Sequence, residues 1–384
     1  MFSNSTTVLR IFDIEIRLAA SWFLIAALIT WSLADQVFPA DLPGLTSAQY
    51  LVLGVVGMLL FFASLLLHEL AHAMVARGFG IAVPRITLFL FGGVAELGEE
   101  PDTARHEFWI AIAGPAMSVA LAFAFWIASG LALILAGGPA IPLLLSYLAA
   151  LNLILALFNL LPAFPLDGGR VLRAILWARS GDALSATETA TRMGEFLGLG
   201  LVALGLLTLF QGGSLGGAWQ ILVGLFIILA ARGTLQGLRT RMLLDNQTVA
   251  DLMVPNVVTT DPTLSLADLV NRVMLPNRVS FVPVVEDGVL LGHIDTKVLA
   301  MIDRENWPNT QVDDVFIGLG DDGDSHVIGP DAPATLALQR MTESGVRKLV
   351  VARDRRIVGV LTLSDLTRVL HLLVDLKMQP QPVP

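Results

Sequence analysis

Residues 50–77 read YLVLGVVGMLLFFASLLLHELAHAMVAR, an apolar stretch that is long enough to cross a bilayer and carries HELAH at residues 68–72. On a helix, His68 and His72 lie one turn apart on the same face, so both imidazoles can reach one zinc ion at about 2.0–2.1 Å. Glu69 points away from the axis joining the histidines, where it can take a proton from a zinc-activated water instead of binding the metal. This stretch therefore predicts a membrane helix that contains a metal site.

The position of the motif inside an apolar helix favours a bound metal. An ionisable residue inside a bilayer costs about 2.5–3.5 kcal/mol on insertion scales, and a metal ion would offset that cost. The alternative is a helix end at which the histidines only cap the helix or hydrogen-bond among the headgroups. Arg77 follows His68 by nine residues, which is about 13 Å along a helix. The motif is therefore expected below the membrane surface.

The whole chain has the composition of a membrane protein. Of its 384 residues, 55% are hydrophobic and 15% charged, and the mean hydropathy is +0.72, which excludes a disordered chain, a coiled coil and collagen. Basic residues of the first 243 fall before the first span, between spans two and three, between spans four and five, and at or after the sixth. The positive-inside rule then predicts that both termini are cytosolic. The six predicted spans are 19–38, 50–77, 108–136, 141–163, 194–211 and 216–236.

Charge and cysteine content exclude other classes of protein. Residues 1–243 contain 12 Lys and Arg against 14 Asp and Glu, and residues 244–384 contain 12 against 19, so no nucleic-acid partner is expected. Without cysteine, any metal must be held by His, Asp or Glu. Residues 1–18 are too polar for a cleavable signal peptide.

A catalytic zinc needs a third protein ligand, and Asp167 is the best candidate. It lies in FNLLPAFPLDGGR, residues 158–170, where the fourth span ends at the same cytosolic depth as His68. Two prolines break the helix there, and the paired glycines let backbone approach the metal closely. Taken alone, Asp-Gly-Gly would be an ordinary turn. Other candidates lie in a charged segment that is expected to be solvated: Glu96, Glu99, Glu100, Asp102, His106 and Glu107.

Two segments of the first 243 residues predict β-structure. Residues 14–18, IEIRL, alternate with the period of a half-exposed strand. Residues 84–97, PRITLFLFGGVAEL, are rich in β-branched and aromatic residues around Gly92 and Gly93, which predicts a hairpin. The exposed edge of such a hairpin could bind an extended peptide by strand addition.

Residues 244–384 have the composition of a soluble α/β domain with an internal repeat. Each half, at about 248–306 and 310–372, contains an extended polar lead-in, a helix, two buried strands joined by a turn, and a final helix. Such a repeat predicts a paired module whose halves bury each other's apolar faces. Residues 373–384 are expected to form a flexible tail.

The repeat resembles a pair of CBS domains, a family that commonly binds adenine nucleotides and regulates an attached catalytic or transport domain. Thr362 and Asp365 have the family's Thr-x-x-Asp spacing, which contacts a ribose in that family. The matching stretch of the first half, residues 295–298, reads DTKV and lacks the closing acid. The resemblance implies at most one standard nucleotide site, although Thr362 and Asp365 could also merely cap the final helix.

HELAH in one membrane helix, followed by FNLLPAFPLDGGR in a later one, resembles the site-2 protease family of intramembrane zinc metalloproteases. The resemblance covers essentially the whole chain, in the form that carries C-terminal CBS domains. It implies His68, His72 and Asp167 as zinc ligands and Glu69 as general base. It also implies that Asn159 helps to hold substrate or the oxyanion, the alternative being an amide that bonds backbone freed by the nearby proline.

The predicted fold is a polytopic all-α membrane domain, residues 1–243, with six transmembrane helices and small β-hairpin elements, plus a cytosolic α/β CBS-domain pair. The implied activity is a zinc-dependent endopeptidase of the cell membrane that cleaves membrane proteins in or near their transmembrane segments, modulated by an adenine nucleotide. Its expected partners are the lipid bilayer and a transmembrane substrate, and the CBS domains could pair two chains into a homodimer. A CBS-regulated ion transporter or channel is the alternative, although the ionisable residues form one metal-sized cluster rather than a series across the bilayer.

Overall fold

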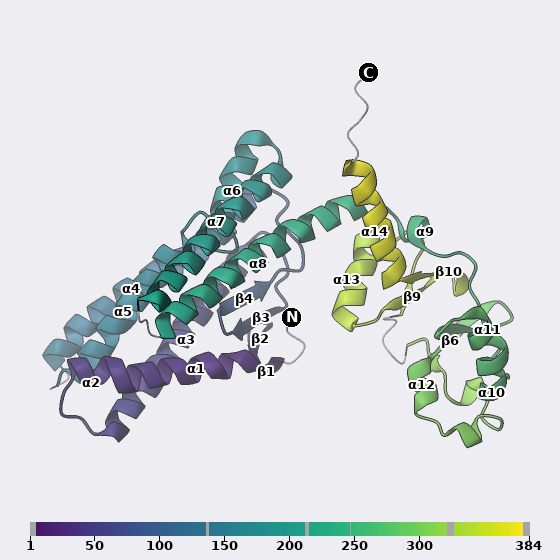
Figure 1. Cartoon of the computed structure of the whole chain (residues 1–384), viewed down its shortest axis with the longest axis horizontal. Helices are drawn as coiled ribbons and strands as arrows, with labels where there is room; N and C mark the ends of the chain where they lie inside the picture. Colours follow the sequence, from purple (N-terminus) through teal and green to yellow (C-terminus); the bar gives the residue numbers. More distant parts are fainter. Residues whose placement is uncertain (1–4, 136–137, 212–214, 246, 321–325, 379–384) are drawn as a thin grey trace. The chain divides into compact units, whose positions relative to one another are not determined.

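The chain folds into two compact units, Met1–Gln236 and Gly237–Pro384. The structure is a computed structural model that describes residues 5–135, 138–211, 215–245, 247–320 and 326–378 (Figure 1).

Six helices of the described residues are long and apolar enough to cross a membrane, which confirms the predicted number of spans. The first span joins α1 (Ala20–Ser32), a π-helical turn (Leu33–Val37) and α2 (Phe38–Asp41). The others are α3 (Ser47–Gly78), α4 (Ala104–Leu135), α5 (Ala140–Asn159), α7 (Ala183–Phe210) and α8 (Leu215–Leu244). A shorter amphipathic helix, α6 (Asp167–Ser180), lies between α5 and α7 in the chain.

Several helices extend beyond the predicted spans because their ends are polar. The fifth span was predicted to begin at residue 194, whereas α7 begins at Ala183. The Asp182 side chain accepts hydrogen bonds from the backbone N–H groups of Leu184 and Ser185 and so caps the helix. Hydropathy finds the part of a helix that matches the hydrocarbon, whereas capping determines where the helix begins.

A four-stranded sheet packs beside α3 in the first unit. Its order is β1-β2-β3-β4, with β2 and β3 parallel and the other pairs antiparallel. The predicted strand at 14–18 and the hairpin at 84–97 are confirmed, whereas β1 was not predicted. The hairpin turn lies at residues 90–91, and Gly92 and Gly93 open the last strand instead. The strands are β1 (Ser5–Ile11), β2 (Ile14–Ala19), β3 (Arg85–Phe89) and β4 (Gly92–Glu96).

The sheet and α3 share one hydrophobic core. Ile14, Ile16 and Ile86 of the sheet are buried with Phe62 and Leu65 of α3. This packing leaves β4 as an edge strand next to α3, and α4 packs along α3, α5 and α6. Helix α4 therefore packs against both α3 and α6, and the edge strand lies on α3.

The second unit contains the predicted repeat of a helix, two strands and a helix. Its sheets have the orders β5-β6-β7 and β10-β9-β8. The first half contains α9 (Val249–Leu252), α10 (Leu266–Asp268), α11 (Leu275–Asn277), β5 (Phe281–Glu286), β6 (Val289–Asp295) and α12 (Thr296–Ala300). Its sheet is completed by β7 (Ile317–Gly318), which pairs with β6 but lies within the predicted second half of the sequence. The second contains β8 (Val327–Ile328), α13 (Ala334–Ser344), β9 (Lys348–Arg353), β10 (Arg356–Thr362) and α14 (Leu363–Met378).

The lead-in of the first half crosses to the second. Val254 pairs with Val360 of β10, and Thr260 pairs with Val284 of β5. The two halves are thereby joined by backbone hydrogen bonds as well as by apolar contacts. Because α14 continues to Met378, residues 373–378 are helical rather than part of the predicted tail, and residues 379–384 lie outside the described part.

Candidate metal centre

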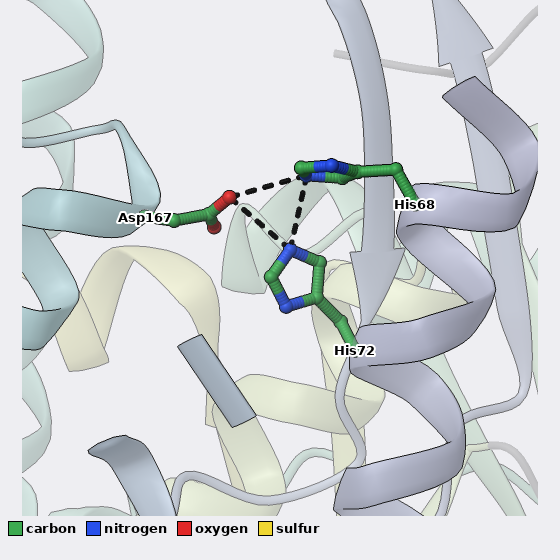
Figure 2. A group of neighbouring side chains, drawn as sticks. All are labelled: His68, His72 and Asp167. Carbon is green, nitrogen blue, oxygen red and sulfur yellow. Dashed lines mark hydrogen bonds and ion pairs between the residues drawn. The ribbon is translucent and has the colours of Figure 1, made fainter. Parts of the chain in front are cut away.

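His68, His72 and Asp167 meet at one point (Figure 2). The Nε2 atoms of the two histidines and Oδ2 of Asp167 are each 3.2 Å from the other two atoms. The histidines come from successive turns of α3, and Asp167 is the first residue of α6. Both imidazoles are buried, with exposed fractions of 2% and 5%. Among the described residues, this is the one group of three or more His, Asp or Glu side chains that could hold a metal ion.

The loop before α6 determines where Asp167 lies. A Cβ on Gly168 would come within 2.3 Å of the Leu160 carbonyl oxygen, and one on Gly169 within 2.4 Å of the Ala163 carbonyl carbon. Only glycine lets residues 160–166 fold this closely onto the first turn of α6. The two glycines were expected to let backbone approach the metal, but they allow this loop to close instead.

Both histidines are oriented by α4. His72 Nδ1 donates to the Ile110 carbonyl oxygen at 2.6 Å, and His68 Nδ1 lies 2.9 Å from Ser118 Oγ. A carbonyl can only accept, so in the neutral ring of His72 the proton lies on Nδ1 and the Nε2 lone pair faces the other two ligand atoms. Partners of this kind hold metal-binding imidazoles in place and increase their basicity.

The spacing of the three atoms fits a tetrahedral ion. Ligands at about 2.0–2.1 Å from such an ion lie about 3.3–3.4 Å apart, close to the separation found here. A Cβ on Gly114 of α4 would lie 2.2 Å from His72 Nε2 and 2.5 Å from His68 Nε2, so glycine keeps side-chain atoms out of this space. Two imidazoles and an ionised carboxylate form a donor set that suits zinc.

Glu69 lies beside this group but outside it. Its side chain is buried between α3 and the edge strand, and the backbone amide of Ala95 faces its carboxylate. A Cβ on Gly93 would come within 2.5 Å of Glu69 Cγ, so the second glycine of the hairpin makes room for this side chain. As predicted, the Glu69 side chain points away from the axis that joins the two histidines.

Asn159 is the last residue of α5 and is half-buried. Its side chain makes no hydrogen bond to any residue in the part of the chain that the structure describes. The alternative role, an amide that bonds backbone near Pro162, therefore has no support in the structure.

Thr362 and Asp365 line a cavity of about 280 Å³ in the second unit. Thr362 Oγ1 donates to Asp365 Oδ2 at 2.6 Å, and the Asp365 N–H donates to Thr362 Oγ1 at 3.1 Å, so the pair also caps α14. In the first half, Asp295 accepts hydrogen bonds from two backbone N–H groups of α12 and acts as its cap. The cavity is also lined by Val254, Asn256, Val257, Val258, Arg278, Val279, Ser280, Phe281, Lys348 and Val360.

One expectation for the charged segment is wrong. Glu107 was expected to be solvated, but it is fully buried and pairs with Arg173 of α6. The pair of Glu107 with Arg173 could not be predicted from sequence, because a charged residue near the end of a span is usually exposed. The contact of His72 with the Ile110 carbonyl could not be predicted either, because a backbone carbonyl has no sequence signal. Ser118 was missed for a similar reason, since a serine in an apolar helix usually bonds its own helix.

The sequence is similar to those of known zinc metalloproteases and CBS domains. The model of peptidase family M50 matches residues 56–141 and 135–201, and that of the CBS domain matches residues 249–299 and 322–372. Rip3 of Mycobacterium tuberculosis, a candidate zinc metalloprotease, is 39% identical over 380 residues, 98% of this chain and 94% of Rip3. A zinc metalloprotease of Methanocaldococcus jannaschii is 36% identical over 251 residues, 65% of this chain and 70% of that protein. The solved site-2 protease from the same organism is 32% identical, with a TM-score of 0.42, over 60% of this chain and 94% of that one.

Proposed function

The chain belongs to peptidase family M50, the zinc metalloproteases, and we propose that it hydrolyses peptide bonds in or near the transmembrane segments of other membrane proteins. The observation that carries this proposal is the group formed by His68, His72 and Asp167, with Glu69 beside it. The two histidines and Glu69 lie in α3, one of the six helices that are long and apolar enough to cross a membrane. A site on such a helix is suited to a peptide segment that is itself in or near the bilayer.

Each polar side chain of the site has a separate role in this proposal. His68, His72 and Asp167 would hold the zinc ion, and the chemistry that zinc supplies in such a site is polarisation of the scissile carbonyl and of the attacking water. Glu69 accepts the proton of that water and passes it to the leaving amine. Asn159, whose side chain has no partner among the described residues, would donate to the oxyanion or to the substrate backbone.

The edge strand β4 supports binding of an extended substrate. Its outer side is not covered by another strand of the sheet, and its Ala95 amide faces Glu69. A peptide that pairs with this edge would run beside the Glu69 carboxylate and satisfy the backbone hydrogen bonds that it loses on unwinding.

Replacing Ala95 by proline is expected to abolish cleavage of a membrane-spanning peptide while zinc stays bound. Proline removes the Ala95 N–H group that faces Glu69, and its ring prevents an added strand from pairing closely with this edge. Cleavage rate and zinc content of the purified variant are the two measurements. The matched control is Val8→Pro, at the bulge of β1 on the opposite edge of the same sheet. Strand addition is rejected if Ala95→Pro cleaves as fast as Val8→Pro.

The second unit would regulate the protease. We propose that both termini are cytosolic, as the distribution of basic residues predicts, which gives the CBS domains access to cellular nucleotides. An adenine nucleotide fits the cavity, because Val257 and Phe281 offer apolar surface for a base and Lys348 offers positive charge for a phosphate. A homodimer through the CBS domains stays a prediction.

Replacing Asp365 by alanine is expected to weaken binding of AMP or ATP about tenfold, the effect of one hydrogen bond of about 1.4 kcal/mol between a carboxylate and a ribose hydroxyl. Titration calorimetry on the full-length protein measures it. The control is Asp251→Ala, which removes a similar capping pair with Thr248 from α9, and neither of these residues lines the cavity. Equal losses in both variants would mean that Asp365 only caps α14.

A further inference from the structure

We propose that Glu107 and Arg173 form a positioning pair that fixes Asp167 against the two histidines. The inference rests on the zinc site proposed above and adds residues that do not touch the metal. It concerns how α6, and with it the third ligand, is held in place.

The pair is buried and makes two contacts. Arg173 Nε donates to Glu107 Oε2 at 2.7 Å, and Arg173 Nη2 lies 2.7 Å from Glu107 Oε1. The exposed fraction is 0% for Glu107 and 7% for Arg173. Arg170 Nε lies 3.7 Å from the same Oε1 atom, so two arginines of α6 face one carboxylate of α4.

This contact fixes Asp167 from both sides along the chain. Arg173 follows Asp167 by six residues of the same helix, less than two turns. Before Asp167, the ring of Phe164 packs against the Arg173 guanidinium, with 5.9 Å between its centroid and Cζ. Phe164 N–H also donates to the Ala190 carbonyl oxygen of α7, so the loop is attached at its other end. A shift of Arg173 would therefore move both the loop and the first turn of α6.

The pair extends a role that α4 already has. One turn after Glu107, the Ile110 carbonyl accepts from His72, and further along the helix Ser118 contacts His68. With Glu107 holding α6, all three proposed ligands are oriented by one helix. Such a common support keeps three ligand atoms from two separate helices at the 3.2 Å spacing.

The energetics of a buried ion pair also indicate that Glu107 and Arg173 position α6 rather than stabilise the fold. Removing two charges from water costs about as much as a buried ion pair returns, so apolar residues of similar volume would stabilise α4 and α6 at least as well. What an Arg–carboxylate pair provides and apolar packing lacks is a fixed direction, because the planar guanidinium meets both oxygens.

The experiment compares zinc affinity, by chelator competition, among the full-length wild type, Glu107→Gln and Arg173→Lys. Both variants are expected to bind zinc about 10–100-fold more weakly, the range for partners outside the ligand set. The absorption spectrum of the Co²⁺-substituted protein should also change, because the carboxylate has moved relative to the imidazoles. The control is Glu195→Gln, which removes the exposed pair with Arg232 and should match the wild type in both measurements.

Wild-type affinity and an unchanged Co²⁺ spectrum in both variants would overturn the positioning role. So would weaker binding with an unchanged spectrum and a lower melting temperature of the zinc-free protein, which would show a purely structural pair. If Glu107→Gln does not fold, Arg173→Lys decides the question, because it keeps both charges and loses only the second contact. A wild type that binds no more zinc than Asp167→Ala would reject the zinc site itself, and the positioning role with it.

Discussion

Asp167→Ala is expected to lose its zinc and, with it, all cleavage of membrane-spanning peptides. His68 and His72 would remain, but two ligands from one helix leave half of the coordination shell to water, whereas catalytic sites use three protein ligands. Zinc content should fall from about one ion per chain to near zero, measured by elemental analysis of the purified protein. The Asp167 carboxylate contacts the two imidazoles and belongs to no hydrophobic core cluster, so the variant should still fold.

Two glycines of α4 provide an independent check of the same site. Gly114→Ala would place a methyl group 2.2 Å from His72 Nε2, in the space that the ion needs, and should also abolish zinc binding. Gly130→Ala is the matched control on the same helix, since nothing lies within 4 Å of its added Cβ. Full zinc occupancy in Asp167→Ala or in Gly114→Ala would show that the ion, if bound, lies elsewhere.

Glu69→Gln is expected to keep its zinc and lose cleavage activity by about 10²–10⁴-fold, the usual contribution of a positioned general base. The amide has the shape of the carboxylate but cannot accept the proton of the attacking water. The measurements are the rate of cleavage of a membrane-spanning peptide and the zinc content of the same preparation. Glu195→Gln, at a partly exposed position of α7, is the control for loss of a carboxylate elsewhere in the first unit.

This variant also separates the protease from a CBS-regulated ion carrier. A carrier with Glu69→Gln would still move ions, with a shifted ion affinity, whereas a protease has no ion flux to retain. Cleavage at the wild-type rate by Glu69→Gln would remove Glu69 from the mechanism and leave another residue as the base.

The residues of the site could be predicted because their spacing has direct geometric meaning. His68 and His72 share a face of any helix, and the segment around them is too apolar to be anything except a buried or membrane helix. Asp167 required one more step, the order of the spans, which predicted that it lies at the same depth as His68, and its side chain does lie next to His68. The repeat after residue 243 similarly predicted two halves that pack together.

Other expectations failed where local sequence has two interpretations. Glu107, next to several other charged residues, was expected to be solvated, yet α6 supplies Arg173 to a place that no local pattern indicates. Gly92 and Gly93 predicted a turn, but Leu90 and Phe91 form it, and Gly93 instead makes room for Glu69. Glycine signals both a turn and a close approach, and only the neighbouring element decides between them.

The amino-acid sequence by itself determined the six spans, the pair of histidines on one helix face, the carboxylate that follows the fourth span and the repeated α/β module, because hydropathy and periodicity are local properties. Only the tertiary structure decided that α4 contacts His72 through Ile110, His68 through Ser118 and α6 through the pair of Glu107 with Arg173, and that β4 is an edge strand beside Glu69. These features depend on which helices and strands pack side by side. Packing is set by the shapes of many side chains together, and no single motif encodes it.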